Sequence, residues 1–225
     1  MEDFGWDPFV ETHQLVEDLL SLIAAPLAPH TQVRLGLLLY SHLTEVDAVY
    51  EVLANLCRVV TGRRYVMDPF LDSYPRNRKG EAQFLSTSGR VRALTEMLST
   101  ASHPELGEPI DWFFQASVRN AFAHADYTLH QDKFRTRGQP FEIGGVVTPE
   151  LHLSVINDIV NRALTFYDVF MGEYHDQRGS YRGNKVVTGR ISGGEEFEPV
   201  ELLADPARGR HGFQSPPASK PPEAE

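Results

Sequence analysis

Two side chains that could cleave RNA without a metal ion lie five positions apart near the middle of the chain. Arg119 keeps its charge at physiological pH and can hold a phosphate, and His124 titrates near neutral pH, so it can take up and release protons. Attack of an RNA 2′-hydroxyl on the adjacent phosphorus needs a base, an acid and cations for the phosphoryl oxygens. The pair predicts a site in which Arg119 binds the phosphate, His124 transfers protons, and Asn120 orients His124 or donates a hydrogen bond to the phosphate. DNA would resist cleavage because it lacks the 2′-hydroxyl.

Other polar residues could support this pair. Asp126 and Tyr127 follow His124 and could position its ring, or Tyr127 could pack with its hydroxyl towards solvent. His42 and Glu45 have a spacing that can place two ligands on one metal ion, but no second pair accompanies them. We expect them to support Arg119 or to be ordinary helical residues, and we expect neither a metal ion nor a cofactor.

A helix over residues 110–123 is expected to carry the pair. At roughly 100° per residue, Arg119 and His124 would lie roughly 140° apart on a continuous helix, too far to hold one phosphate. Either the helix ends before His124 and lets it turn inward, or a symmetric dimer brings the pairs of two chains, and hence two histidines, into one cleft. The face away from the core carries a strip that favours close approach of a second helix or subunit. This strip consists of Trp112, Ala116 and Ala123.

The segment from Arg119 to His124 is similar to the R-x4–6-H motif of HEPN domains, including the polar residue after the arginine. The segment 119–127 as a whole, residues 40–47 and the turn at 68–70 also resemble bacterial HEPN-like proteins, so the resemblance covers roughly residues 10–173. It implies a homodimeric metal-independent endoribonuclease of phage defence, a toxin–antitoxin pair or a stress response, with an antitoxin or defence-system partner. In HEPN toxins silenced by a nucleotidyltransferase the tyrosine follows the histidine by two positions, whereas Tyr127 follows His124 by three. Control by adenylylation of Tyr127 is therefore not implied.

Two other interpretations of the motif stay open. Arg119 and Asn120 could pin a helical bundle, with His124 placed favourably at a helix C-terminus. Alternatively, a catalytically inactive HEPN-like module could bind RNA, a nucleotide or a protein partner through the same face.

The charges of the chain are unevenly distributed. The net charge of −10 argues against a nucleic-acid partner, because phosphate binding depends on Lys and Arg. However, residues 58–92 carry eight basic and three acidic residues, a net charge of +5, and a second basic cluster follows the motif. These residues are either solvated surface cations or a groove for an RNA backbone. The residues expected to bind RNA are Arg76, Arg78, Lys79, Arg135 and Arg137.

Hydrophobic periodicity predicts a mostly helical chain. The expected helices span 8–27, 31–61, 89–101, 110–123 and 149–171. The second would present a core stripe that consists of Val33, Leu37, Leu38, Val46, Val49, Leu53 and Leu56. The segment 63–89, with its prolines and glycines, is typical of a long functional loop. Alternation around glycine turns predicts a short hairpin within 134–147.

We therefore expect an all-α, HEPN-like helical bundle with a small C-terminal β appendage and a disordered tail. At 225 residues the chain can bury one substantial core. The expected parts are a helical domain over 1–173, a β-rich appendage over 174–204, and a disordered tail over 205–225 with five prolines.

The expected compartment is the cytoplasm. Cys57 is the only cysteine, so the chain has no internal disulfide. No apolar run approaches the roughly 20 residues that span a bilayer, and the N-terminus is acidic where a secretory signal would be basic. We expect no membrane partner.

Overall fold

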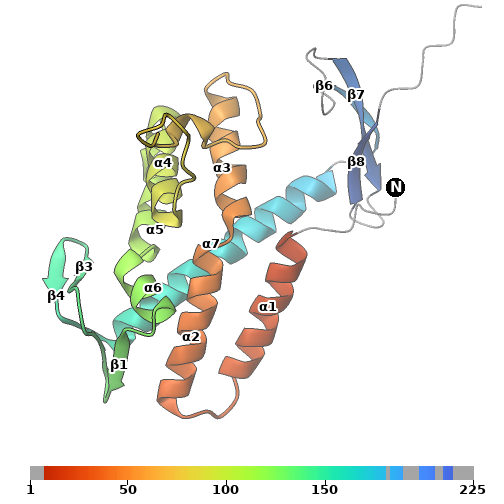
Figure 1. Ribbon diagram of the computed structural model, residues 1–225. Coiled ribbons are helices and arrows are strands. Elements are labelled where there is room, and N and C mark those ends of the chain that lie inside the picture. The colour runs from red at the N-terminus through yellow and green to blue at the C-terminus, as the bar shows by residue number, and fades with distance from the viewer. Residues whose placement is uncertain (1–7, 181–182, 190–197, 206–209, 215–225) are drawn as a thin grey trace, which may run out of the picture. The chain divides into compact units, whose positions relative to one another are not determined.

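The computed structural model describes residues 8–180, 183–189, 198–205 and 210–214 (Figure 1). The chain divides within its longest helix into a unit spanning Pro8–Val169, here called the helical unit, and a unit that begins at Phe170. The α-helices are α1 (Pro8–Ile23), α2 (Pro29–Thr44), α3 (Asp47–Val60), α4 (Thr87–Thr100), α5 (Gly107–Phe113), α6 (Ala116–Ala123) and α7 (Leu153–Ser180). The strands are β1 (Tyr127–His130), β2 (Lys133–Thr136), β3 (Phe141–Ile143), β4 (Val146–Thr148), β5 (Glu150–His152), β6 (Lys185–Gly189), β7 (Glu198–Asp205) and β8 (Arg210–Gln214). Single 3-10 turns occur at Leu71–Ser73 and Pro104–Leu106.

The expectation of an all-α fold is wrong, because three small antiparallel sheets accompany the helices and make the fold mixed α and β. Two of them, with strand orders β1-β2-β5 and β3-β4, lie inside the helical unit. In the hairpin of β3 and β4, Gly144 and Gly145 have φ angles of 58° and 78°, which a tight two-residue turn requires. The hairpin expected within 134–147 is therefore β3–β4, while Phe134 belongs to β2 of the other sheet.

A row of aromatic rings explains why such short strands form next to α6. Phe122 of α6 contacts Tyr127 of β1, which stacks on Phe134 of β2, which in turn contacts Phe141 of β3. The ring centroids are 5.6, 5.2 and 5.5 Å apart along this row. Phe134 and Phe141 are fully buried, so the sheets are joined to the helices by aromatic burial. Strands of three or four residues carry too little periodicity to distinguish them from loops, which is why β1 and β5 were not expected.

The helix expected over 31–61 is two helices that meet at Glu45 and Val46. The Thr44 hydroxyl donates to the Tyr40 carbonyl at 3.0 Å, and the Tyr50 hydroxyl donates to the Thr44 carbonyl at 3.1 Å. In a continuous helix the Thr44 carbonyl would accept from a backbone amide of the same helix. Here it accepts from a side chain instead. The break leaves Glu45 in the corner between α2 and α3.

The helix expected over 110–123 is also split, because Phe114 and Gln115 have extended backbones with ψ of 90° and 92°. The buried hydroxyl of Tyr40 accepts from the Gln115 amide at 2.8 Å and donates to the Phe113 carbonyl at 2.9 Å. The Gln115 side-chain amide donates to the Trp112 carbonyl at 2.7 Å. These bonds satisfy the backbone groups that the break would otherwise bury unpaired.

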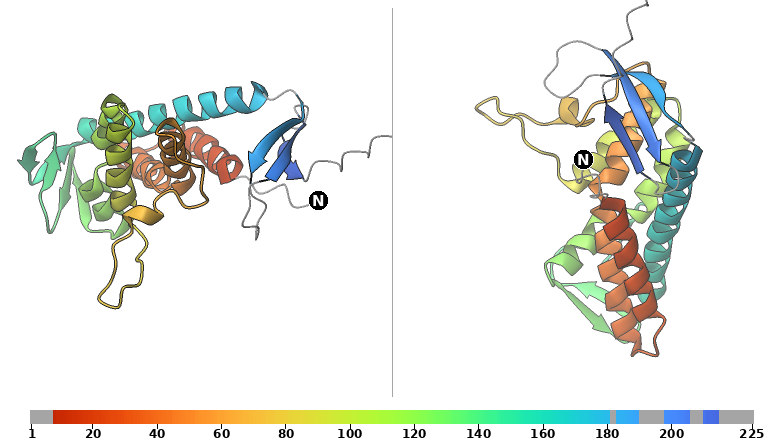
Figure 2. Two further views of the ribbon diagram at one scale, coloured as in Figure 1. Left: turned by 90° about the horizontal axis from the view of Figure 1, so that it is seen from above. Right: turned by 90° about the vertical axis from the view of Figure 1, so that its right-hand side faces the viewer.

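The other expected elements differ mainly in their ends. The helix expected over 89–101 is α4, which begins after Ser86, whose hydroxyl accepts from the Gly89 amide at 3.3 Å. The helix expected over 8–27 ends at Ile23, and the one expected over 149–171 spans Leu153–Ser180, because Glu150–His152 forms β5. The segment between α3 and α4 is mostly irregular and projects from the helices (Figure 2).

The expected C-terminal hairpin is present as β6 and β7, and a third strand, β8, extends it. The expectation of a disordered tail is therefore wrong for Arg210–Gln214, whose backbone groups pair with β7. The rest of the tail after Asp205 lies outside the described residues.

Each helix from α1 to α7 contributes buried apolar side chains. The largest fully buried residues include Leu37, Tyr40, Tyr50, Leu94, Ile110, Val118, Ile156 and Ile159. The ring of Phe113 packs on Phe166 with centroids 5.1 Å apart, which joins α5 to α7. Leu38 and Leu56, expected in the core stripe, are instead 46% and 56% exposed. No helix in the described ranges is both long and apolar enough to cross a membrane.

Candidate functional site

The motif residues lie on and just after the short helix α6. Arg119 and Asn120 lie within α6, and His124 is its C-cap residue with an exposed side chain. The helix ends in a turn in which the Asp126 amide donates to the Ala121 carbonyl at 2.9 Å and Ala125 has a φ of 52°. The helix therefore ends before His124, as the first of the two arrangements requires, but the His124 amide still donates to the Asn120 carbonyl and its side chain is exposed rather than turned inward.

The guanidinium of Arg119 is held from two sides. Its Nη2 forms an ion pair with Oε1 of Glu45, and its Nη1 donates to Oδ1 of Asn120 at 3.2 Å. The second carboxylate oxygen of Glu45 accepts from the hydroxyl of Thr87 at 2.8 Å. The side chain of Arg119 is 23% exposed, so it stays accessible from solvent. These contacts join α6, the corner between α2 and α3, and the first turn of α4.

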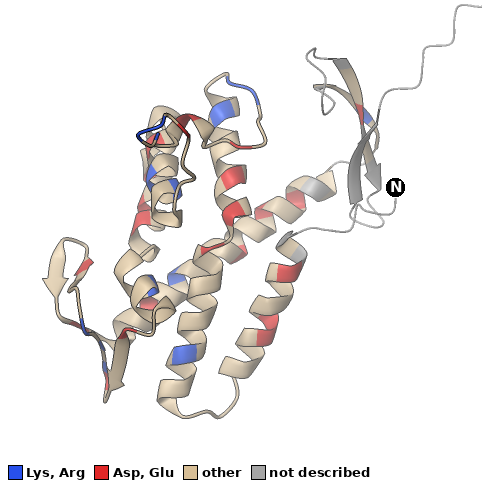
Figure 3. Cartoon of the chain, in the orientation of Figure 1, with Lys and Arg blue, Asp and Glu red and all other residues tan. Residues whose placement is uncertain are grey.

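The surroundings of this ion pair are acidic. Arg90 on α4 contacts Asp47 at 2.7 Å and Glu51 at 3.6 Å, both on α3. Burial raises the pKa of both Asp47 and Glu51, partly offset by the charge of Arg90, and the charge of Glu45 raises the pKa of Asp47 further. Figure 3 shows acidic residues along α3. A phosphate at Arg119 would therefore lie close to several carboxylates.

His42, expected to support Arg119, occupies a different environment from Glu45. Its Nε2 is buried and has no hydrogen-bond partner among the described residues. Burial also lowers the pKa of His42, which favours the neutral ring. Of the two residues, only Glu45 bonds to Arg119 in the structure.

Asn120, Asp126 and Tyr127 make contacts that lead away from the His124 ring. The Asn120 oxygen bonds Arg119, so this side chain orients the guanidinium. Asp126 lies 4.0 Å from Nε of Arg137, and Tyr127 stacks in the aromatic row.

The five cations expected to bind RNA lie in two regions of the helical unit. Arg78 and Lys79 are exposed in the loop between α3 and α4, where Arg76 uses its Nη1 to donate to the Gly80 carbonyl at 3.0 Å. Arg135 on β2 contacts Glu150 at 2.6 Å, and Arg137 is 80% exposed. Glu150 also forms an ion pair with Lys133, so it offsets only part of the charge of Arg135, whereas Arg78, Lys79 and Arg137 face solvent.

The expected strip does not form one helix face, because Trp112 lies on α5 while Ala116 and Ala123 lie on α6. Arg162 of α7 covers the Trp112 ring, with its guanidinium carbon 3.1 Å from the ring centroid. The Trp112 ring thus packs against a residue of its own chain. A dimer through Ala116 stays a prediction, but Trp112 no longer supports it.

Thr87 was missed by the sequence analysis. It lies 42 positions from Glu45, and no local spacing connects a helix-opening threonine to a distant carboxylate.

In the part of the chain that the structure describes, no three His, Cys, Asp or Glu side chains are grouped as ligands for a metal ion. Comparison with family models, curated proteins and solved structures finds no match to this chain.

Proposed function

We propose that this protein is a cytoplasmic, metal-independent endoribonuclease of the HEPN type, in which Arg119 binds the scissile phosphate and His124 transfers protons. The observation that carries the proposal is the end of α6, where an oriented, partly exposed arginine is followed by an exposed histidine at the C-cap. A guanidinium has five N–H donors. Glu45 and Asn120 engage Nη2 and Nη1, and the remaining N–H groups are sufficient to bind a phosphate oxygen.

The reaction proceeds by attack of the 2′-oxygen on phosphorus. The 2′-hydroxyl proton passes to a base, the bond from phosphorus to the 5′-oxygen breaks, and an acid gives that oxygen a proton. The products are a 2′,3′-cyclic phosphate and a 5′-hydroxyl. Arg119 stabilises the charge on the phosphoryl oxygens. His124 serves one proton transfer, and the His124 of a second copy serves the other if the chain acts as a dimer.

A second candidate is a catalytically inactive module that binds a nucleotide, RNA or a protein partner through the same face. The observation that favours it is the compensation of Arg119 by Glu45, with Asp47 and Glu51 nearby, which weakens attraction for phosphate. A partner with an exposed cation or amide would suit these carboxylates better than RNA. Both candidates fit a role beside an antitoxin or another defence-system protein.

The decisive experiment compares His124→Ala with His130→Ala on labelled single-stranded RNA in the presence of EDTA. His130 is also exposed and lies six positions later, outside the motif, so its variant is a matched control. We expect cleavage to fall at least about 100-fold in His124→Ala, the usual contribution of a positioned proton-transfer group, and to stay unchanged in His130→Ala. Detection of 2′,3′-cyclic phosphate ends identifies the reaction. No cleavage by the wild-type protein, or equal cleavage by both variants, contradicts the proposal.

Glu45→Gln and Arg119→Gln distinguish catalysis from a purely structural ion pair. Both variants break the same pair, which is worth about 1 kcal/mol or less at such exposure, so each should lower the melting temperature by only a few degrees. If Arg119 binds the phosphate, Arg119→Gln loses cleavage and Glu45→Gln retains it. Equal loss of stability with unchanged cleavage and RNA binding in both variants favours a purely structural ion pair.

A further inference from the structure

The C-terminal half of α3 exposes an apolar surface, here called the α3 patch, which consists of Leu56, Val59 and Val60. Their exposed fractions are 56%, 56% and 65%. At roughly 100° per residue the three side chains fall within roughly 100° of one another around the helix. Val49, on the same side about two to three turns earlier, is buried. This side of α3 is therefore covered where the helix begins and uncovered where it ends.

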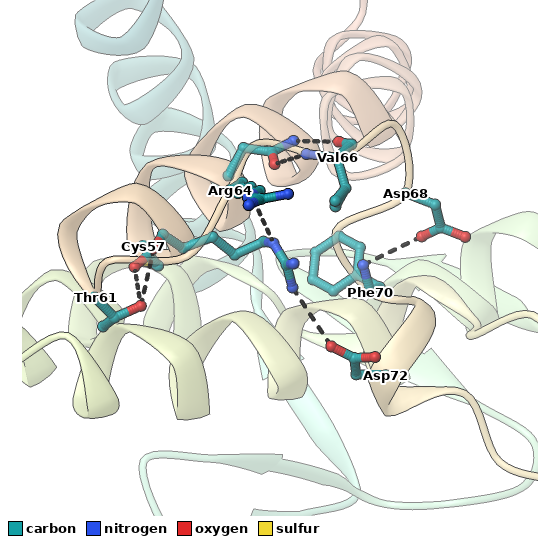
Figure 4. Close-up of polar contacts among 9 residues, drawn as sticks. Cys57, Thr61, Arg64, Val66, Asp68, Phe70 and Asp72 are labelled. Atoms are coloured by element: carbon teal, nitrogen blue, oxygen red, sulfur yellow. Dashed lines mark hydrogen bonds and ion pairs between the residues drawn. The ribbon is translucent and has the colours of Figure 1, made fainter. Parts of the chain in front are cut away.

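The loop beside the α3 patch is held in a fixed conformation (Figure 4). The buried side chain of Asn55 donates to the Val66 carbonyl and accepts from the Val66 amide, both at 3.0 Å. Nε of Arg58 donates to the Arg64 carbonyl at 3.1 Å. Asn55 and Arg58 lie about 40° and 100° around the helix from Val59, so the loop adjoins the α3 patch.

This fixed loop presents both apolar and basic side chains to solvent. Tyr65 is 67% exposed and Met67 is 86% exposed, and Arg63 and Arg64 are exposed at the start of the loop. Contiguous exposed apolar patches rimmed by polar residues mark interaction sites, whereas scattered single apolar residues are ordinary surface. The loop and the α3 patch together form an apolar surface with positive charge at one end.

A complementary surface lies on α1 of the same chain. Glu11, Leu15, Asp18 and Leu22 follow one another at intervals of four, three and four residues, so they form one stripe along the helix, here called the α1 stripe. All four side chains are exposed, and Val16 and Leu19 on the inner side of α1 are buried. The α1 stripe alternates acidic and apolar residues, which matches the apolar and basic character of the other surface.

We propose that the α1 stripe of a second copy of this chain docks on the α3 patch. Leu15 and Leu22 then contact the aliphatic residues of the α3 patch, and Asp18 faces Arg63. Each copy carries both surfaces, so the contact can repeat from copy to copy, and it closes as a dimer with two equal contacts where a two-fold axis relates the copies. RNA is a less suitable occupant, because it would leave three aliphatic side chains of α3 uncovered. This inference does not depend on ribonuclease activity.

A charge exchange between the two surfaces tests the proposal. We expect Asp18→Lys and Arg63→Glu each to weaken association at least about 10-fold, because like charges would then face each other across the contact. The variant that carries both changes restores the pair with reversed sign and should recover most of the affinity. Glu17→Lys is the control, since Glu17 is also exposed on α1 but lies about 100° from Asp18, outside the α1 stripe. All three substitutions are at exposed positions, so circular dichroism should show the wild-type fold in each variant.

The measurement is molar mass by light scattering over a range of micromolar concentrations. A wild-type dimer that each single variant weakens and the combined variant restores supports the proposal. A monomeric wild-type protein, or single variants that dimerise as the wild type does, overturns it. So does a combined variant that stays as weak as the single ones. Loss of RNA affinity in Arg63→Glu with no change in mass would assign the loop to RNA instead.

Discussion

Single residues in left-handed conformations end three helices of this protein, one of them at the candidate site. In each case the amide two residues after the helix cap donates to a carbonyl five residues earlier, with distances of 2.7, 2.9 and 2.9 Å for Arg63, His103 and Asp126. The residue between cap and donor has a positive φ. It is glycine after α3 but not after the other two helices, where the residues are Ser102 with φ of 67° and Ala125 with φ of 52°. The residue that follows His124 is therefore strained.

Ala125→Gly should stabilise the protein. An L-residue in the left-handed region costs about 1–2 kcal/mol, and the greater freedom of glycine in the unfolded chain offsets up to about 1 kcal/mol of this. We expect a net gain of up to about 1 kcal/mol in the free energy of unfolding, measured by urea denaturation, with RNA cleavage unchanged. Ala123→Gly, within the last turn of α6, should instead lose up to about 1 kcal/mol. A loss of stability in Ala125→Gly would contradict the left-handed turn after His124.

The elements show which parts of the fold can be predicted from sequence. Periodicity predicted α1 and α4 closely and the irregular segment between α3 and α4, because repeating apolar positions and clustered Pro and Gly are local signals. The breaks at Glu45 and Phe114 were missed, because tyrosine hydroxyls bind the backbone groups that the breaks set free. At Phe114 the hydroxyl comes from Tyr40, which is distant in sequence, and at Glu45 it comes from Tyr50 on the next helix. The same limit applies to the site. Arg119, His124 and Glu45 could be selected by type and spacing, but the link through Thr87 depends on tertiary packing.

Tyr40→Phe should destabilise the junction between α5 and α6. The Tyr40 hydroxyl is buried and bonds the Gln115 amide and the Phe113 carbonyl, and burial raises the pKa of this phenol well above its usual range. Its removal leaves these backbone groups buried without a partner, which costs about 1–3 kcal/mol. Thermal denaturation should show this loss in Tyr40→Phe and almost none in Tyr127→Phe, whose ring stacks in the aromatic row. Equal stability of the two variants would mean that the break between the helices does not depend on the hydroxyl.

The net charge of the whole chain is negative, but one segment carries a positive net charge. The net charge is −10, yet residues 58–92 carry +5. Within that segment the cations are not equivalent, because Arg90 contacts Asp47 and Glu51, and Arg58 contacts Asp72 at 3.5 Å. Such paired cations release few counterions when RNA binds. The exposed cations of the loop between α3 and α4 should therefore dominate the salt dependence of RNA binding.

Replacement of both Arg78 and Lys79 by alanine tests this expectation directly. Each phosphate contact to single-stranded nucleic acid contributes about 0.7 to the slope of log affinity against log salt concentration, so the double variant should lower the slope by about 1.4. Arg135→Ala is the matched control, because Glu150, which also pairs with Lys133, already offsets part of its charge at 2.6 Å and its removal should change the slope less. Both variants alter exposed side chains of the helical unit, and their melting temperatures should stay within a few degrees of the wild type. Fluorescence anisotropy with a labelled single-stranded RNA over a series of salt concentrations gives the slopes. An unchanged slope in the double variant would show that the loop is ordinary solvated surface, and a larger change in Arg135→Ala would move the RNA contact to the β1-β2-β5 sheet.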